Sequence, residues 1–207
     1  DLLIVDEASM IDTLLMHHLL KAVPARASFV VVGDINQLPS VGAGNVLKDI
    51  IDSGAVPIVE LHEIFRQARE SSIIVNAHLI NEGKMPRLES APGKLDDFYF
   101  IEQEDPQKVM ELIITLVRER IPRRFGFDPI DDIQVLTPMH RGVVGGINLN
   151  AELQNALNPG EGGVLRMGRQ YRINDKVMQI SNNYDKEVYN GDIGRIIAID
   201  TEAQEIA

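Results

Sequence analysis

The sequence predicts an α/β fold in which helices cover a parallel β-sheet. Short apolar segments alternate with helical stretches over residues 1–61, and each apolar segment runs into a polar or glycine-rich turn. Continuous apolar segments are typical of strands that are buried on both faces, as in parallel sheets. Strands are therefore expected over residues 2–5 (LLIV), 28–32 (SFVVV) and 57–61 (PIVEL).

Helices are expected where apolar residues recur at helical spacing between capping and breaking residues. Asp12 or Ser9 can cap the first helix, and Pro24 ends it. Asp105 followed by Pro106 is a typical helix start. The helices are predicted over residues 10–23, 45–52, 71–82, 105–122 and 147–157.

The middle of the chain repeats the α/β pattern, and its last part changes to short β-rich segments. Two further strands are expected over residues 97–101 and 132–137. From about residue 164, strands over residues 176–180 and 193–200 are separated by polar turns that include Asn190-Gly191, a pair typical of tight hairpins. A small antiparallel barrel or sheet is predicted there.

The composition is that of an ordinary globular protein, and it limits the classes of function. The chain has 207 residues, 44% of them hydrophobic, a net charge of −11 and no cysteine. The lack of cysteine fits a reducing cytoplasm, and no apolar run approaches the roughly 20 residues of a membrane helix. The net negative charge argues against a protein that coats nucleic acid with a broad basic surface. Any contact with DNA is therefore expected in a local groove. The chain starts inside a predicted strand and without Met, which suggests a piece of a longer protein.

Two acidic residues, Asp6 and Glu7, follow the first predicted strand. An Asp at such a position can hold Mg²⁺ beside a nucleotide, and the next Glu can polarise an attacking water. The alternative is that both acids only favour the start of a helix. The segment DEAS alone leaves both interpretations open.

A second polar segment, GDINQLPSVGAG from Gly33 to Gly44, follows the second predicted strand. Gln37 at a strand end can hydrogen-bond a phosphate and a lytic water, and the glycines would let the backbone approach a ligand closely. A flexible loop is the alternative. Because parallel strands end at one edge of a sheet, both polar segments are expected at the edge where such folds bind ligands.

Arg66, in the segment IFRQ after the third predicted strand, is a candidate for stabilising a γ-phosphate. An arginine that reaches the phosphate from a neighbouring domain accelerates phosphoryl transfer by about 10³–10⁵ in known cases. A single arginine in this position is more often part of a surface ion pair. Arg66 is therefore a candidate for the phosphate site only because the two motifs before it also indicate one.

The order DEAS, GDxxQLPSVGxG and LxxIFRQ resembles the superfamily 1 DNA helicases, and within them the RecD-like group, which includes the alpha subunit of exodeoxyribonuclease V. The later segments VLTPMHRGVVGGINLNAELQ and DKVMQISNNYDKEVYNGDIG resemble the same group. The resemblance covers nearly the whole chain apart from residues 84–124. It implies RecA-like parallel-sheet motor domains of the P-loop NTPase type, here incomplete, with a small SH3-like β insertion at the C-terminal end.

The resemblance also implies roles for the residues of these motifs. Asp6 and Glu7 would hold Mg²⁺, and Glu7 would be the catalytic base. Gln37, supported by Asp34, would sense the γ-phosphate of ATP, which Arg66 would clamp from the second motor domain. Single-stranded DNA would be tracked by Leu38, Pro39, Ser40, Val41, Thr137, Pro138, His140 and Arg141. Local positive charge in the β-rich section comes from Arg166, Arg169 and Arg172.

The implied activity is that of an ATP-dependent DNA helicase, an ATP hydrolase that moves along single-stranded DNA and unwinds duplex in recombination and repair, 5′ to 3′ in this group. The implied domains are the C-terminal part of a first motor domain (1–65), the N-terminal part of a second (66–163) and the start of the SH3-like insertion (164–207). The implied partners are single-stranded DNA, duplex junctions and other helicase or nuclease subunits, in the cytoplasm and without a membrane.

Alternatives from other classes stay open. The helicase module could belong to a conjugative relaxase or transfer protein, or to a non-catalytic subunit that only binds partners. The presence of Asp6, Glu7, Gln37 and Arg66 weighs against the non-catalytic subunit. A nuclease is the weakest alternative, because no further cluster of acids and lysine occurs. The phosphate-binding motif GxxxxGK[ST] is absent from these residues, so the chain alone is expected to be inactive as an ATPase.

Overall fold

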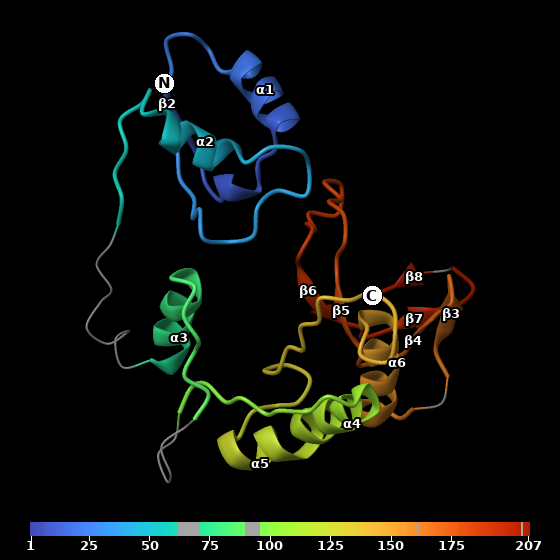
Figure 1. Cartoon of the computed structure of the whole chain (residues 1–207). Helices are drawn as coiled ribbons and strands as arrows, with labels where there is room; N and C mark the ends of the chain where they lie inside the picture. The colour runs from blue at the N-terminus through green and yellow to red at the C-terminus, as the bar shows by residue number, and fades with distance from the viewer. Residues whose placement is uncertain (62–70, 90–95, 161, 204) are drawn as a thin grey trace. The chain divides into compact units, whose positions relative to one another are not determined.

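The computed structural model describes residues 1–61, 71–89, 96–160, 162–203 and 205–207. The chain divides into two compact bodies, residues 1–100 and residues 101–207, to which we refer as unit 1 and unit 2 (Figure 1). In the described part of the chain, no helix combines the length and the apolar character that crossing a bilayer requires.

Two parallel strands form the sheet of unit 1. β1 (Leu2–Val5) pairs with β2 (Ser28–Val31), with Val5 opposite Val31. Side chains alternate between the two faces of a sheet. Val5 and Val31 pack against the core, whereas Ile4 on the other face is 58% exposed. The parallel pairing predicted from the first two apolar segments is confirmed.

Helices cover the packed face of this sheet. The 3₁₀ turn η1 (Ala8–Met10) and helix α1 (Thr13–Ala22) connect β1 to β2, and α2 (Val46–Ser53) follows β2. Their apolar sides meet the sheet in one hydrophobic core. The buried residues of this core are Ala8, Ile11, Met16 and Leu47, and Val5, Leu19, Phe29, Val31, Val46, Ile50 and Ile51 pack against them.

Capping residues fix the ends of the helices in unit 1. A backbone N–H in the first turn of α1 donates to Asp12 Oδ1 over 2.7 Å, so Asp12 and not Ser9 is its cap. Gly54 ends α2 with φ 62°, a left-handed conformation that glycine accepts at little cost. α3 (Ser72–Asn81) begins after Ser71, whose hydroxyl accepts a backbone N–H of the first turn. The helices predicted over residues 10–23, 45–52 and 71–82 are confirmed, although the first begins only at Thr13.

Three predicted strands, over residues 57–61, 97–101 and 132–137, are wrong. None of them has a hydrogen-bonded neighbouring strand among the described residues. Apolar or alternating residues predict an extended backbone, but a strand also needs a partner, and that partner depends on residues far away in the sequence. Val59 and Leu61 are accordingly 87% and 94% exposed.

A long helix with a π-helical segment in its middle belongs to unit 2. α4 (Pro106–Thr115) continues through the π segment η3 (Leu116–Arg120) into α5 (Ile121–Phe125). The predicted end at Pro122 is wrong, since the helix runs through this residue. Proline lacks the N–H of an α-helical hydrogen bond, and its ring clashes with the carbonyl four residues earlier. The wider π turn directly before Pro122 accommodates both effects.

Helix α6 (Gly146–Leu157) precedes antiparallel strand pairs in the rest of unit 2, and it confirms the helix predicted over residues 147–157. The pairs in the described chain are β3 (Val164–Arg166) with β4 (Arg169–Tyr171), β5 (Lys176–Met178) with β6 (Ile193–Arg195), and β7 (Ile199–Asp200) with β8 (Glu205–Ile206). The strand predicted over residues 193–200 is divided into β6 and β7, and the buried Ile196 lies between them.

A buried asparagine holds the segment that follows α3. Asn76 is 2% exposed, and its side-chain amide pairs with both backbone groups of Arg87. Asn76 Nδ2 donates to the carbonyl of Arg87 over 3.0 Å, and Asn76 Oδ1 accepts from its N–H over 2.8 Å. This arrangement satisfies a polar side chain whose burial would otherwise be costly. α3 thereby fixes the course of residues 84–89.

Replacing Asn76 by Ala is expected to lower the free energy of unfolding by about 1–3 kcal/mol, because both backbone groups of Arg87 lose their partner. Asn81→Ala, at the exposed end of the same helix, is the matched control and is expected to stay within about 0.5 kcal/mol of the parent. Urea unfolding followed by circular dichroism measures both. Equal stabilities of the two variants would contradict the role given to Asn76.

Candidate functional site

The ends of β1 and β2 lie side by side at one edge of the sheet in unit 1. Their pairing continues one step past the strands, because the N–H of Val32 donates to the carbonyl of Val5 over 2.8 Å and the N–H of Ala8 donates to the carbonyl of Val32 over 2.9 Å. Gly33 then lies so close to the other turn that a Cβ on it would be 3.0 Å from the backbone nitrogen of Ser9. The two polar turns are therefore adjacent, as the sequence predicts.

Both carboxylates at this edge are exposed. Asp6 Oδ1 accepts from the N–H of Glu7 over 2.9 Å, which holds the Asp6 side chain against the backbone. Glu7 has a left-handed backbone, with φ 52° and ψ 37°, a conformation that is unfavourable for residues other than glycine. The Glu7 side chain makes no capping bond to η1, so its carboxylate does not serve as a helix cap.

Ser9 adds a buried hydroxyl to this edge. The residue is 7% exposed, and within the described chain its Oγ has no hydrogen-bond partner. Leaving a buried hydroxyl unpaired is unfavourable, so such groups mark places where a further polar group belongs. The sequence indicated Ser9 only as a possible helix cap, because its burial depends on the packing of Gly33 and Leu47 against the same turn.

The donor set at this edge fits Mg²⁺ bound together with a nucleotide. Magnesium in phosphate sites is held by one or two carboxylates, with phosphate oxygens and water as its other ligands. Asp6 and Glu7 supply two exposed carboxylates on one turn. Among the residues that the structure describes, no group of three or more His, Asp or Glu side chains could hold a metal by itself. A Mg²⁺ ion held by Asp6 and Glu7 would take its remaining ligands from phosphate and water.

Asp34 shapes the turn that presents Gln37. Asp34 Oδ1 accepts from the N–H of Asn36 over 2.8 Å, and the carbonyl of Asp34 accepts from the N–H of Gln37 over 3.2 Å. The first bond is typical of an Asx turn, which Asp forms readily. The side chain of Gln37 is exposed on the turn that follows β2. Asp34 thus supports Gln37 through the backbone rather than by contact with its amide.

The glycine-rich loop after Gln37 packs against the start of α1. Ser40 Oγ donates to the carbonyls of Gly42 and Gly44 over 3.1 and 3.0 Å. A Cβ on Gly42 would overlap the carboxylate that caps α1. The close approach that these glycines permit is therefore made to α1, whereas the sequence indicated an approach to a ligand. Leu38 and Val41 are left almost fully exposed on the same loop.

The predicted nucleotide-site residues are thus only partly described. Asp6, Glu7, Asp34 and Gln37 lie on the two adjacent turns of unit 1. Arg66, the predicted ligand of the γ-phosphate, lies outside the described residues. The candidate DNA residues are divided between the loop after Gln37 in unit 1 and residues 137–141 in unit 2.

In unit 2, residues 137–141 form a tight loop at the start of α6. Thr137 Oγ1 donates to the carbonyl of Val144 over 2.8 Å and so closes the loop from within. Gly145 is buried, and a Cβ on it would lie 2.5 Å from the backbone carbonyl of Arg141. The exposed side chains of the loop are those of Pro138, Met139, His140 and Arg141.

Arg141 lines a hollow of about 720 Å³ together with residues of α4 and α6. Asn148 Nδ2 donates to the carbonyl of Val143 over 2.8 Å and holds the rim of this hollow. Its walls combine apolar side chains with one guanidinium, from Arg141, and one carboxylate, from Glu152. Asn148 lies inside the segment VLTPMHRGVVGGINLNAELQ, but the sequence alone gave this residue no role. The other lining residues include Gln107, Met110, Ile147 and Ala151.

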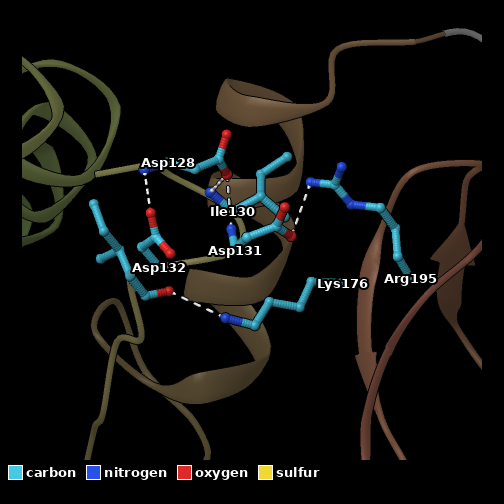
Figure 2. A network of polar contacts seen from close by, with 7 residues as sticks. Asp128, Ile130, Asp131, Asp132, Lys176 and Arg195 are labelled. Atoms are coloured by element: carbon cyan, nitrogen blue, oxygen red, sulfur yellow. Dashed lines mark hydrogen bonds and ion pairs between the residues drawn. The ribbon is translucent and has the colours of Figure 1, made fainter. Parts of the chain in front are cut away.

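A polar turn precedes this loop (Figure 2). Asp128 Oδ1 accepts from the N–H groups of Ile130 and Asp131 over 2.8 and 2.7 Å. Asp132 Oδ2 accepts from the N–H of Asp128 over 2.7 Å, so the two carboxylates close the turn from both ends. The hydrogen bonds from Asp131 and Ile130, helped by the positive charges of Arg195 and Lys176, hold the pKa of Asp128 below its usual value of 3.8.

Two basic residues attach this turn to the strands β5 and β6. Lys176 Nζ donates to the carbonyl of Ile133 over 3.3 Å, and Arg195 forms an ion pair with Asp131 over 3.2 Å (Figure 2). Lys176 and Arg195 are opposite each other in the register of the two strands. The β-rich part of unit 2 is therefore linked to the segment that leads into residues 137–141.

Comparison with known proteins gives matches over both units. Residues 1–104 match the family described as AAA domain, and residues 149–207 match the family described as ATP-dependent RecD-like DNA helicase SH3 domain. The chain is 38% identical over 197 residues to the ATP-dependent RecD2 DNA helicase of Deinococcus radiodurans, covering 95% of this chain and 26% of that protein. It is 27% identical over 205 residues to the RecBCD enzyme subunit RecD of Mycolicibacterium smegmatis, covering 96% of this chain and 36% of that protein. The chain thus spans only about a quarter to a third of the length of these relatives.

The turn around Asp128 gives a prediction for acid stability. Because its folded-state pKa is lowered, Asp128 contributes stability above the unfolded pKa of about 3.8, and this contribution is lost as the pH falls through the lower folded pKa. Asp128→Asn is therefore expected to lower the melting temperature at neutral pH, with a deficit that shrinks below about pH 3.8. Thermal unfolding between neutral and acidic pH, with the exposed Asp185→Asn as control, measures this. A deficit that is independent of pH would refute the assignment.

Proposed function

The chain belongs to the family of AAA domains, with a C-terminal match to the SH3 domain of RecD-like helicases, and on this premise we propose that it is part of an ATP-driven DNA helicase. Such a motor couples ATP hydrolysis to movement along single-stranded DNA and unwinds the duplex ahead of it, in recombination and repair. We assign it the 5′-to-3′ direction of the group that the motifs resemble. The activity of the whole protein is part of this proposal, because the chain spans a minor part of its relatives.

One observation carries the proposal: the two polar turns after β1 and β2 are hydrogen-bonded neighbours at one edge of the sheet. Ligands of open α/β sheets bind at the carboxyl ends of the strands, which is this edge. Two carboxylates from one turn and an amide from the next are among the groups that nucleotide hydrolysis uses. Their adjacency supports a nucleotide site, whereas acids on separate surfaces would not.

Each side chain at this edge has a role in the proposed reaction. The Asp6 side chain is held by the hydrogen bond from the backbone N–H of Glu7. Asp6 would be the carboxylate on the Mg²⁺ side of the nucleotide. Glu7 would accept a proton from the attacking water. Gln37 would hydrogen-bond the γ-phosphate or that water, and Arg66 would neutralise charge on the phosphate. When bound, Mg²⁺ would neutralise the phosphate charge and fix the phosphate orientation.

The DNA strand is assigned to the exposed residues of two loops. Leu38, Pro39, Ser40 and Val41 form one of them, and residues 137–141 with the hollow beside Arg141 form the other. We propose the domain limits 1–65 and 66–163 for the two motor parts and 164–207 for the SH3-like part. Motor domains that close on ATP and open after hydrolysis would move the strand between these loops. The same proposal implies action in the cytoplasm, on single strands and duplex junctions, with other helicase or nuclease subunits as partners.

Glu7→Gln is expected to lower kcat for ATP hydrolysis by about 10²–10⁴ in a polypeptide that joins these residues to a GxxxxGK[ST] loop, because the general base is lost. ATP binding should change little, since glutamine keeps the size of the side chain. Phosphate release and nucleotide titration measure the two quantities. Glu89→Gln, an exposed acid in unit 1, is the control. Wild-type turnover in Glu7→Gln would refute the role of this residue.

The 207-residue chain alone is expected to show no ATP hydrolysis above background. Its sequence has no GxxxxGK[ST] loop, whose backbone and lysine make most of the contacts to the phosphates. Phosphate release with and without Mg²⁺ tests this. Hydrolysis that depends on Mg²⁺ and disappears in Glu7→Gln would contradict the expectation while supporting the assignment of Glu7.

A further inference from the structure

The end of the helix α4–η3–α5 carries a concentration of positive charge in an acidic chain. Arg118, Arg120, Arg123 and Arg124 are all exposed, and only Glu119 among residues 116–125 is acidic. Arg120, Arg123 and Arg124 line one hollow of about 530 Å³ with Thr115 and Glu119. In the described part of the chain, no hydrogen bond or ion pair engages these four guanidinium groups. We refer to Arg120, Arg123 and Arg124 as the arginine cluster.

The ordinary structural explanation covers only part of this cluster. A helix C-terminus attracts cations, and Arg123 and Arg124 lie in the last turn of α5, so the helix dipole accounts for them. The effect fades beyond one turn, so it does not account for Arg120. Like charges spaced three and four residues apart repel each other on a helix, and that repulsion is relieved when an anion lies between them. The arrangement therefore favours an anionic ligand.

A pair of aromatic rings follows the arginine cluster directly. Gly126 ends α5 with φ 78°, and this left-handed turn leads the chain to Phe127, whose ring stacks on Phe125 with centroids 5.9 Å apart. Phe127 is 49% exposed and Phe125 is 38% exposed. Half-exposed aromatic rings beside a basic groove are typical of surfaces that bind single-stranded nucleic acid, because the rings stack on bases while the cations pair with phosphates.

The same helix connects this surface with the hollow at Arg141. Gln107 and Met110 in the first half of α4 line that hollow, and the arginine cluster lies at the other end. Met110 and Arg120 are about 15 Å apart along a helix axis that rises about 1.5 Å per residue. A strand of a few nucleotides covers this distance. Continuity with the assigned DNA loop favours nucleic acid over an acidic protein or a lipid surface.

We propose that the arginine cluster and Phe127 form a second contact for single-stranded DNA, with the guanidinium groups on phosphates and the phenyl ring on a base. This inference rests on the proposed function for the identity of the strand, but the contact itself belongs to none of the motor motifs. It lies over residues 120–127, outside every helicase motif quoted from the sequence.

Fluorescence anisotropy of the 207-residue chain with an oligothymidylate of about 16 nucleotides tests the contact. The triple variant Arg120→Gln, Arg123→Gln, Arg124→Gln is expected to bind at least about tenfold more weakly and to lower the salt slope by about 2, since each phosphate contact on a single strand contributes about 0.7. Lys21→Gln, Arg26→Gln, Arg87→Gln removes the same charge from exposed sites of unit 1 and is expected to bind like the parent. Circular dichroism confirms folding of both variants.

Phe127→Leu separates stacking from charge. It is expected to weaken binding of the oligothymidylate by about fivefold or more without changing the salt slope. An abasic strand of equal length should bind the parent and Phe127→Leu alike, because no base is present to stack. Equal binding of oligothymidylate by the parent and Phe127→Leu would remove the aromatic part of the proposal.

Two outcomes overturn the inference as a whole. One is a triple variant that binds the oligothymidylate as well as its charge-matched control does. If Arg141→Gln nevertheless weakens binding in the same assay, the proposed function stands and only the second contact fails. The other is a triple variant that binds the oligothymidylate normally but binds poly-glutamate, or phosphatidylserine–phosphatidylcholine vesicles, more weakly than the parent. Weaker binding of poly-glutamate would identify an acidic protein as the partner, and weaker binding of the vesicles would identify a membrane surface.

Discussion

The parallel pairing of β1 with β2 is the constraint on which the candidate nucleotide site depends. The register sets Val5 opposite Val31, and the ladder is prolonged by the bond from Val32 to Val5 and by that from Ala8 to Val32. A shift by one residue would exchange the faces of the strands and separate the two turns. A Cβ at Gly33 would lie 2.8 Å from Leu47 Cδ2 and 3.0 and 3.1 Å from the backbone nitrogens of Ser9 and Ala8, so glycine favours this close approach of the two turns. Hydrogen bonds between strands, rather than contacts between the candidate side chains, therefore position the candidate site.

This pairing also explains why an unfavourable backbone is maintained at Glu7. A left-handed conformation in a residue other than glycine costs on the order of 1–3 kcal/mol, and it persists only where the surroundings impose it. Here the carbonyl of Glu7 accepts from the N–H of Met10, and its N–H donates to Asp6. Both neighbours of this residue are thus fixed, one by the strand pair and the other by η1. The constraint leaves the Glu7 side chain exposed beside Asp6.

Local signals in the sequence located the helices, although not every helix end, and were insufficient for several strands. Asp12, Ser71 and Gly54 mark helix ends through bonds to residues a few positions away, so their effect can be predicted from the chain itself. Residues 57–61 and 132–137 have the composition of strands, but a strand exists only with a partner, which no local pattern specifies. Pro122 is the opposite case, since a strong local signal was overridden by a π turn. In the site, Asp34 and Gln37 could be placed from the strand that precedes them, whereas the burial of Ser9 could not, because it depends on packing between distant segments.

The distribution of positive charge distinguishes structural cations from those left for a ligand. Arg172 belongs to the fold: its guanidinium donates to the carbonyl of Asn158 over 2.9 Å and to Asn155 Oδ1 over 3.1 Å, and so ties α6 to the β-rich section. Arg195 and Lys176 likewise hold the turn at residues 128–133. In a chain with a net charge of −11, a cation without such a contact is surrounded by excess negative charge that could have paired with it. Among the residues that the structure describes, exposed arginines that gather on one helix without such contacts are therefore well suited to bind an external polyanion. A local cluster can do so although the whole chain is acidic, since electrostatic attraction is screened beyond about 10 Å in salt.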